Sequence, residues 1–326
     1  MSKKNRKYLL AVVIIISLFA MMYYIYDGSN KNTSSSSTIK EEADTITYVD
    51  ALGRTVEVKK NPERVISLYN SYTEAWYLAG GMVIGRIEST TGLPSAALNA
   101  EVVGTMSTPN IEKIIALKPD LLLIRKDMGG QSEITAILDQ NKIPYVAIEY
   151  ESVKEYVDVM KFFTDLTGKK DLYKENGQDV LAQVDSIVKK VPQDKKPSVL
   201  LMFGTSKSVT AKLPNYAVGM MLKDLGTTNI AEGLSGVEGD TVTFSMESVI
   251  AKDPDYIFVI TMGDVEKAKE RISKDVEKNP AWASLTAVKN KRYIYLPADL
   301  FLYKANDRYA EAYEHLAKIL YTDVFK

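Results

Sequence analysis

The sequence predicts an α/β protein made of two Rossmann-like lobes that are joined by one long helix. The pattern T-x-x-x-E-x-x-I-A-x-x-P-D occurs twice, once from Thr108 and once from Thr243. Short apolar runs alternate with helical segments in two separate blocks, and an amphipathic stretch lies between the blocks. Because 326 residues exceed the roughly 100 to 200 residues of a typical domain, two lobes are the expected organisation.

The first block, residues 46–166, has the pattern of one α/β lobe. A helix is expected near its start, because Ser71 and Glu74 have the spacing of a capping box and Gly80 or Gly81 can end a helix. Short β-branched apolar runs are typical of strands buried inside a parallel sheet. The predicted strands are residues 65–68, 83–87, 121–124 and 145–148.

The second block, residues 193–326, restarts the same alternation. Its predicted strands are residues 198–203, 256–260 and 292–296, and a helix over 307–321 closes the chain.

The stretch between the blocks, residues 167–192, predicts the long helix. Its apolar residues recur at helical spacing until Pro192. Such a helix would be about 30 Å long at 1.5 Å per residue. A helix packed on both lobes would restrict them to a small rearrangement.

Each copy of the repeated pattern predicts a helix, a turn and a buried strand. Thr108 and Thr243 are suitable N-caps, and the proline of each copy ends its helix because the residue before a proline disfavours the α region. Glu112 and Glu247 then fall near a helix N-terminus, where the helix dipole favours a carboxylate. The repeat therefore places one such glutamate on each lobe.

The N-terminal residues 1–26 predict a membrane anchor. Basic residues precede an apolar run from Tyr8 to Tyr26, which reaches the ~18 to 20 residues that span a bilayer. The flanking positive charge favours a single-pass protein of the cell membrane with its globular part outside the cytoplasm. A cleaved signal peptide is the alternative, although no small-x-small cleavage site follows the run. Residues 27–45 are polar and Ser-rich, which predicts a flexible linker.

Composition excludes several classes of function. The formal net charge is −1, so no basic field indicates a nucleic-acid partner. The absence of cysteine removes disulfides, thiolate metal sites and a lipid attached through a thioether. The sequence lacks G-x-S-x-G, P-loop and H-E-x-x-H motifs, and we expect no enzyme. Its one histidine, His315, has the spacing of a helix-surface position and makes import of free zinc or manganese unfavourable.

Four segments of the chain carry a family resemblance. These segments are TYVDALGRTVEVKKNPERVISL, NIEKIIALKPDLLLI, SMESVIAKDPDYIFVI and NPAWASLTAVKNKRYIYLP. Together they resemble the substrate-binding proteins of ABC importers that capture iron–siderophore complexes, haem or cobalamin. The resemblance covers residues 46–326 and implies two lobes, one long interlobe helix and a ligand cleft between the lobes. We expect a monomer without a cofactor of its own.

The resemblance also implies how the protein meets its partner. In such proteins a glutamate on each lobe docks onto arginines of the membrane permease, and the matching positions are Glu112 and Glu247. The expected partners are therefore a permease dimer with its ATPase subunits. The chain departs from related Gram-positive proteins because it lacks the cysteine that carries their lipid, and the apolar N-terminal helix would replace it.

The resemblance places the ligand beside loops that follow the strands. Cationic and tyrosine side chains there suit an anionic iron chelate or haem propionates. Met106 resembles an axial haem ligand of haem-binding relatives, but Met262 stands where they have histidine, and thioethers hold ferric haem less firmly. We therefore rank a ferric siderophore first, haem second and cobalamin third. The predicted ligand-binding residues are Tyr69, Asn70, Thr105, Met106, Arg125, Lys126, Phe203, Lys207, Tyr216, Met262, Tyr303 and Lys304.

A ligand-sensing receptor ectodomain is the alternative function. Only residues 1–7 precede the apolar run, so the sequence shows no cytoplasmic output domain. A sensor of this kind would need a separate signalling partner.

Overall fold

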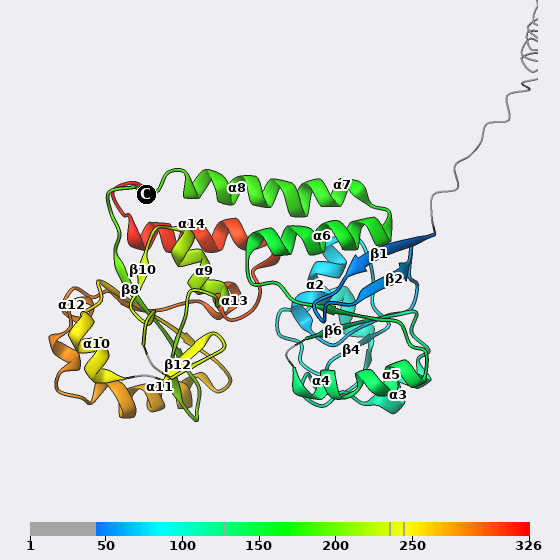
Figure 1. The fold of residues 1–326 in the computed structure, drawn as a ribbon, viewed down its shortest axis with the longest axis horizontal. Coiled ribbons are helices and arrows are strands. Elements are labelled where there is room, and N and C mark those ends of the chain that lie inside the picture. Colours follow the sequence, from blue (N-terminus) through cyan, green and yellow to red (C-terminus); the bar gives the residue numbers. More distant parts are fainter. Residues whose placement is uncertain (1–43, 127, 235, 244) are drawn as a thin grey trace, which may run out of the picture. The chain divides into compact units, whose positions relative to one another are not determined.

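Figure 1 shows a computed structural model of the chain, which describes residues 44–326 except 127, 235 and 244. The expected membrane anchor at residues 8–26 therefore lies outside the described residues. The described chain starts with an antiparallel hairpin of β1 (Thr45–Val49) and β2 (Thr55–Lys59). The Asp50 carboxylate closes this hairpin by accepting hydrogen bonds from two backbone amides of the turn.

The first sheet has the strand order β5-β4-β3-β6-β7, with every neighbouring pair parallel. Its central strands are buried on both faces, as is usual for a parallel sheet between helices. Three predicted strands are confirmed, whereas the strand expected over 83–87 is only two residues long. The elements of this N-terminal lobe are β3 (Val65–Ser67), α2 (Asn70–Leu78), β4 (Gly85–Arg86), η1 (Ser95–Asn99), β5 (Glu101–Val102), α3 (Ile111–Ala116), β6 (Leu121–Arg125), α4 (Gly129–Glu133), α5 (Thr135–Gln140) and β7 (Tyr145–Ile148).

The second sheet is mixed, with the order β11-β12-β9-β8-β13-β14 and β10 beside β8. The predicted runs form the parallel strands β8, β13 and β14, but the short parallel strand β10 and the antiparallel strands β9, β11 and β12 were not expected from the sequence. They are short, and polar residues interrupt their apolar pattern. The elements are β8 (Ser198–Gly204), β9 (Val209–Lys212), α9 (Ala217–Asp224), β10 (Thr228–Asn229), β11 (Val237–Glu238), β12 (Thr241–Thr243), α10 (Met246–Lys252), β13 (Tyr256–Thr261), α11 (Val265–Ile272), η3 (Ser273–Glu277), η4 (Trp282–Ser284), α12 (Thr286–Lys289), β14 (Tyr293–Tyr295), α13 (Ala298–Phe301) and η5 (Asn306–Arg308).

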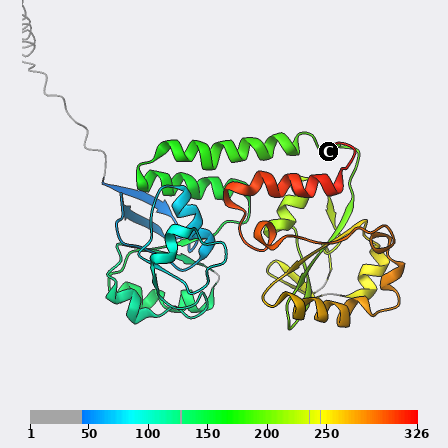
Figure 2. The same cartoon turned by 180° about the vertical axis from the view of Figure 1, so that it is seen from behind.

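A helical layer connects the segments that carry the two sheets. It contains α6 (Val153–Thr167), the run α7 (Lys170–Tyr173), η2 (Lys174–Gln178) and α8 (Asp179–Val188), and the closing helix α14 (Tyr309–Leu320). In both views α8 lies alongside α14, while α7 lies alongside α6 (Figures 1 and 2).

The prediction of one uninterrupted helix over 167–192 needs correction. Gly168 adopts a left-handed conformation, with a φ of 70°, and ends α6. The helical run then extends from residue 170 to 188, and a π turn at 174–178 divides it. At this turn Tyr156 Oη donates to the carbonyl of Asn176, and Asn176 Nδ2 donates to the carbonyl of Leu78. These two hydrogen bonds to other elements are made at the place where the helix changes from α to π geometry.

The repeated motif has different helix caps from those predicted. Asn110, not Thr108, caps α3 by accepting from the Lys113 amide, and Ser245, not Thr243, caps α10. Thr243 is the last residue of β12, so its backbone belongs to the sheet. The capping box expected at Ser71 and Glu74 is also absent, because both lie inside α2. The two real caps still occupy equivalent places in the repeat.

The aspartate of each Pro-Asp pair performs the same structural task in both lobes. Asp120 accepts from the backbone amides of Glu63 and Arg64, at 2.8 and 2.9 Å, just before β3. Asp255 accepts from the amide and the hydroxyl of Ser198, each at 2.8 Å, at the first residue of β8. Each carboxylate therefore fixes the start of the neighbouring parallel strand. This role gives a physical reason why the Pro-Asp pair recurs at the same place in both copies of the repeat.

We predict that Asp255→Ala lowers the free energy of unfolding by about 1 to 3 kcal/mol, because the strand start loses two charge-assisted hydrogen bonds. Urea unfolding followed by circular dichroism measures the change. Asp194→Ala is the matched control, since Asp194 is exposed and has no hydrogen bond among the described contacts. Equal stability of the two variants would contradict the assigned role.

Candidate functional site

A pocket of about 520 Å³ lies between loops of the two lobes. Its N-terminal wall comes from the ends of β3, β4 and β5, and its C-terminal wall from the segments after β13 and α13. Ligands of open α/β sheets bind at such carboxyl ends. The lining residues are Tyr69, Asn70, Ser71, Ile87, Glu88, Ser89, Thr105, Met106, Ser107, Met262, Gly263, Leu302 and Tyr303.

Six residues expected at the ligand site line this pocket together. Tyr69, Asn70, Thr105 and Met106 belong to the N-terminal wall, while Met262 and Tyr303 belong to the C-terminal wall. Both thioethers therefore face one cavity from opposite lobes.

Gln131 holds three loops of the N-terminal wall together. Its Nε2 donates to the carbonyls of Leu68 and Met106, at 2.9 and 3.0 Å, and its Oε1 accepts from the Arg125 amide at 2.7 Å. The residue is fully buried. Sequence reasoning missed Gln131, because its position on the short helix α4 gives no signal until the loops are placed around it.

Asn70 positions the rim of the pocket. Its Nδ2 donates to the carbonyls of Ser89 and Thr91, at 2.9 Å each, so it fixes the loop after β4. Its Oδ1 is buried and has no hydrogen-bond partner among the described residues. A buried acceptor without a partner is costly, and a ligand donor could satisfy it.

Cationic side chains cover aromatic rings beside the pocket. The Arg125 guanidinium lies 5.1 Å from the centre of the Tyr69 ring, and the Lys304 ammonium lies 5.6 Å from that of Tyr150. Burial raises the pKa of Tyr69, so its phenol stays protonated and can donate a hydrogen bond at neutral pH. Such an arrangement offers donors and positive charge to an anion.

Phe203 and Tyr216 form a second aromatic group on the C-terminal lobe. The Lys212 ammonium lies 5.1 and 4.8 Å from their ring centres and is paired with Asp240. Burial raises the pKa of Tyr216, and the nearby Glu151 carboxylate adds to the effect. Lys212 was not anticipated from the sequence, since its chemistry depends on the rings that β8 and α9 bring beside it.

Six of the twelve expected ligand residues do not line the pocket, and two of these, Lys126 and Lys207, are exposed. Lys126 is exposed and pairs with Glu149 at 3.0 Å, and Lys207 is exposed in the turn between β8 and β9. Each ammonium group is therefore placed in solvent, where a charge contributes little binding free energy.

Asn306 joins the two lobes beside Ser71, which lines the pocket. It accepts from Tyr150 Oη at 2.6 Å and donates to the Ser71 carbonyl and to Glu74 Oε2, at 3.0 and 2.6 Å. Its φ of 52° lies in the left-handed region, which asparagine tolerates better than most residues. Burial raises the pKa of the Glu74 carboxyl to about 7, and the neighbouring Asp307 adds to this.

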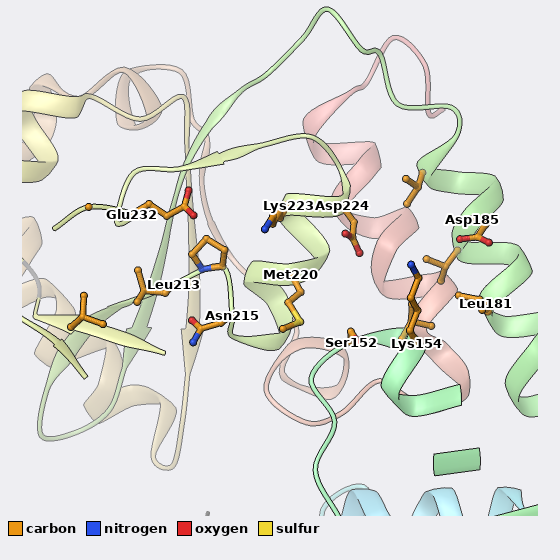
Figure 3. A pocket seen from close by; sticks show the side chains of 16 residues that line it. Ser152, Lys154, Leu181, Asp185, Leu213, Asn215, Met220, Lys223, Asp224 and Glu232 are labelled. Carbon is orange, nitrogen blue, oxygen red and sulfur yellow. The ribbon is translucent and has the colours of Figure 1, made fainter. Parts of the chain in front are cut away.

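A larger cavity, of about 800 Å³, shares no lining residue with the interlobe pocket. Figure 3 shows it between the α6 and α8 side and the α9 side, with Lys154, Asp185, Lys223 and Glu232 at its margin. The charges around it are mixed, and none of the expected ligand residues lines it. We therefore assign the candidate ligand site to the smaller pocket.

Glu112 and Glu247 are exposed, each in the first turn of its helix. They hold equivalent positions in α3 and α10, two residues after the capping side chain. Among the described residues, no cluster of three or more His, Asp or Glu side chains could hold a bare metal ion.

Two sheets of the α/β type with a pocket between their loops are typical of a two-lobed binding protein. The family described as "Periplasmic binding protein" matches residues 65–300, and the chain belongs to that family. Its members are transport components and not enzymes, and this protein is a substrate-binding protein of an ABC importer. The resemblance seen in the sequence is thereby confirmed.

Two proteins of Bacillus subtilis are similar in sequence. The uncharacterized ABC transporter substrate-binding lipoprotein YvrC is 27% identical over 88% of this chain and 89% of its own length. The probable siderophore-binding lipoprotein YfiY is 25% identical over 82% of this chain and 84% of its own length. The crystal structure of Staphylococcus aureus IsdE complexed with heme has a TM-score of 0.69 and 22% identity, covering 79% of this chain and 98% of IsdE. At 22% identity, the similarity to the IsdE structure shows a shared fold and nothing more specific.

The predicted single-pass membrane localisation is corrected. Within residues 44–326, apart from the three undescribed positions, no helix is both long and apolar enough to cross a membrane. YvrC and YfiY are named lipoproteins, a class that a lipid holds at the membrane instead of a protein helix. The single-pass localisation is therefore not retained.

We predict that Glu74 makes stability depend on pH. A carboxyl whose folded-state pKa is raised from 4.5 to about 7 stabilises the fold most below pH 4.5, and this contribution is lost as pH rises through 7. The loss is about 3 kcal/mol, from 1.36 kcal/mol per pKa unit between 4.5 and about 7. Urea unfolding between pH 5 and 8 should show a weaker decline in Glu74→Gln than in the unmodified protein. Identical pH profiles would refute the assignment.

Proposed function

We propose that the cargo of this substrate-binding protein is an iron complex, in the first place a ferric siderophore, held between the two lobes. The observation that carries the proposal is the interlobe pocket, in which hydroxyl and aromatic groups meet beside Arg125 and Lys304. Carboxylate, catecholate or hydroxamate oxygens of an iron chelate accept hydrogen bonds from such groups. The name of the relative YfiY, a probable siderophore-binding lipoprotein, supports the same class.

Haem is the second candidate cargo. Met106 and Met262 line the same pocket from opposite lobes, where a planar ligand could lie between them. The similar fold of heme-bound IsdE supports this candidate at the level of fold. Thioethers favour reduced iron, however, and His315 of α14 contacts Phe301 of α13 and does not line the pocket. A siderophore therefore fits the site better.

We propose that cargo is delivered to a permease dimer with its ATPase subunits. Glu112 and Glu247 are exposed, equivalent and on separate lobes, so each could meet one permease subunit. The protein would act as a monomer, outside the cytoplasm and associated with the membrane. The lipoprotein names of YvrC and YfiY support that location.

We propose that the helical run of residues 170–188 links the lobes and limits their motion. Its first part contacts α6 and its last part contacts α14, so the run is packed along its length. A packed helix bends less than a loop linker does.

Titration with iron complexes tests the cargo. We predict that ferric siderophores quench the fluorescence of the protein, while haemin gives no strong Soret shift. Trp76 and Trp282 are buried outside the pocket, so quenching would report energy transfer to the coloured complex. A strong haem Soret band that is lost in Met106→Leu would reverse the ranking. No binding of any iron complex would overturn the proposed cargo.

Substitution of both docking glutamates tests delivery. We predict that Glu112→Ala with Glu247→Ala abolishes uptake of the cargo by cells, while the affinity of the purified protein for the cargo stays unchanged. Glu133→Ala with Glu270→Ala is the matched control, because it also removes one exposed carboxylate from each lobe. Normal uptake by the docking variant would contradict this role.

A further inference from the structure

Glu151 lies between two cations that come from opposite lobes. The Lys304 ammonium donates to Glu151 Oε1, and Arg125 Nη2 lies 3.8 Å from the same oxygen. The Arg125 and Lys304 side chains are 17% and 7% exposed, and that of Glu151 is 22% exposed. These three groups together carry one net positive charge in a largely dry environment.

The Glu151 carboxylate is only partly satisfied. Its Oε2 is buried and has no hydrogen-bond donor among the described residues. A buried ion pair stabilises a fold well only when its remaining hydrogen-bonding capacity is met. The ion pairs of Glu151 with Lys304 and Arg125 therefore differ from a structural ion pair, in which both carboxylate oxygens are hydrogen-bonded.

The group borders the proposed cargo site. Arg125 covers Tyr69, which lines the pocket, and Lys304 follows Tyr303, which lines it from the other lobe. An anionic ligand in the pocket would therefore compete with Glu151 for the same two cations. Such competition depends on the charge of the ligand and not on its shape.

We propose that Glu151 is an internal competing anion that makes the site select cargo by charge. In the empty site its carboxylate lies beside both cations, so a neutral complex gains little from them. A complex with several negative charges attracts both cations more strongly than one carboxylate does, and displaces Glu151 from at least one. This inference rests on the proposed function and adds a specificity-determining residue to it.

Glu151→Gln tests the proposal, because glutamine keeps the shape and removes the charge. The charge of the three groups then rises from +1 to +2. Glu149→Gln is the matched control, since it removes the same charge two residues earlier, from the exposed pair with Lys126. Thermal unfolding of each full-length variant confirms that it is folded.

The probes are ferric citrate and ferric enterobactin as anionic complexes, and ferrichrome as a neutral one, titrated by calorimetry at two salt concentrations. We expect Glu151→Gln to bind the anionic probes about tenfold more tightly, with a steeper loss of affinity at high salt. The affinity for ferrichrome should change by less than about twofold, because this complex carries no net charge. A change of that size is what a weak surface ion pair contributes. Glu149→Gln should match the unmodified protein with every probe.

The outcomes separate this inference from the proposed cargo. If the unmodified protein binds iron complexes but Glu151→Gln binds the anionic probes no more tightly, only the inference is overturned. An equal gain for ferrichrome would also overturn it, because charge would not be the cause. If no iron complex binds to any form, both proposals are wrong. Glu151→Asp is the second variant, used if Glu151→Gln does not fold. It keeps the negative charge but places it one methylene farther from the two cations, so its gain in affinity for the anionic probes should be smaller.

Discussion

The side-chain amide of Asn306 is the contact on which the geometry between the lobes depends. It is fully buried, adopts a left-handed backbone conformation and bonds at once to Tyr150, Ser71 and Glu74. A glycine could adopt the backbone conformation but would supply none of these bonds, and most other residues would be strained there. The amide therefore joins α2 of the first lobe to the segment that begins α14.

Buried aromatic rings extend this contact into the helical layer. Tyr72, Tyr150, Tyr156 and Tyr309 follow one another with ring centres 5.6, 5.8 and 5.5 Å apart. Such pairs stabilise beyond simple burial, and their hydroxyls need partners. The result is a continuous packed contact from the first sheet to α14, against which the loops that carry Tyr303 and Lys304 are placed. The cargo pocket is thus bounded by groups whose positions are set by interlobe packing.

The cations beside the site already interact with aromatic rings and carboxylates of the protein itself. Arg125, Lys212 and Lys304 each lie over aromatic rings and each pairs with a carboxylate. Burying a cation without such partners would cost several kcal/mol. A ligand must therefore replace an existing carboxylate contact before it can bind one of these cations. An anionic cargo can do so and a neutral cargo cannot, which gives a physical basis for discrimination between them.

The sequence by itself determined the α/β class, most of the parallel strands and the equivalence of Glu112 and Glu247, because these follow from local hydrophobic pattern and a repeated spacing. Through the family resemblance it also indicated six of the thirteen residues that line the pocket. It did not determine the antiparallel strands of the second sheet, the true caps Asn110 and Ser245, or the interruption of the helical run, since competing tertiary bonds decide these. Only the tertiary structure brought Gln131, Glu151 and Asn306 to their places, because each has partners at least 25 and up to 235 residues away in the sequence and no local pattern encodes such contacts.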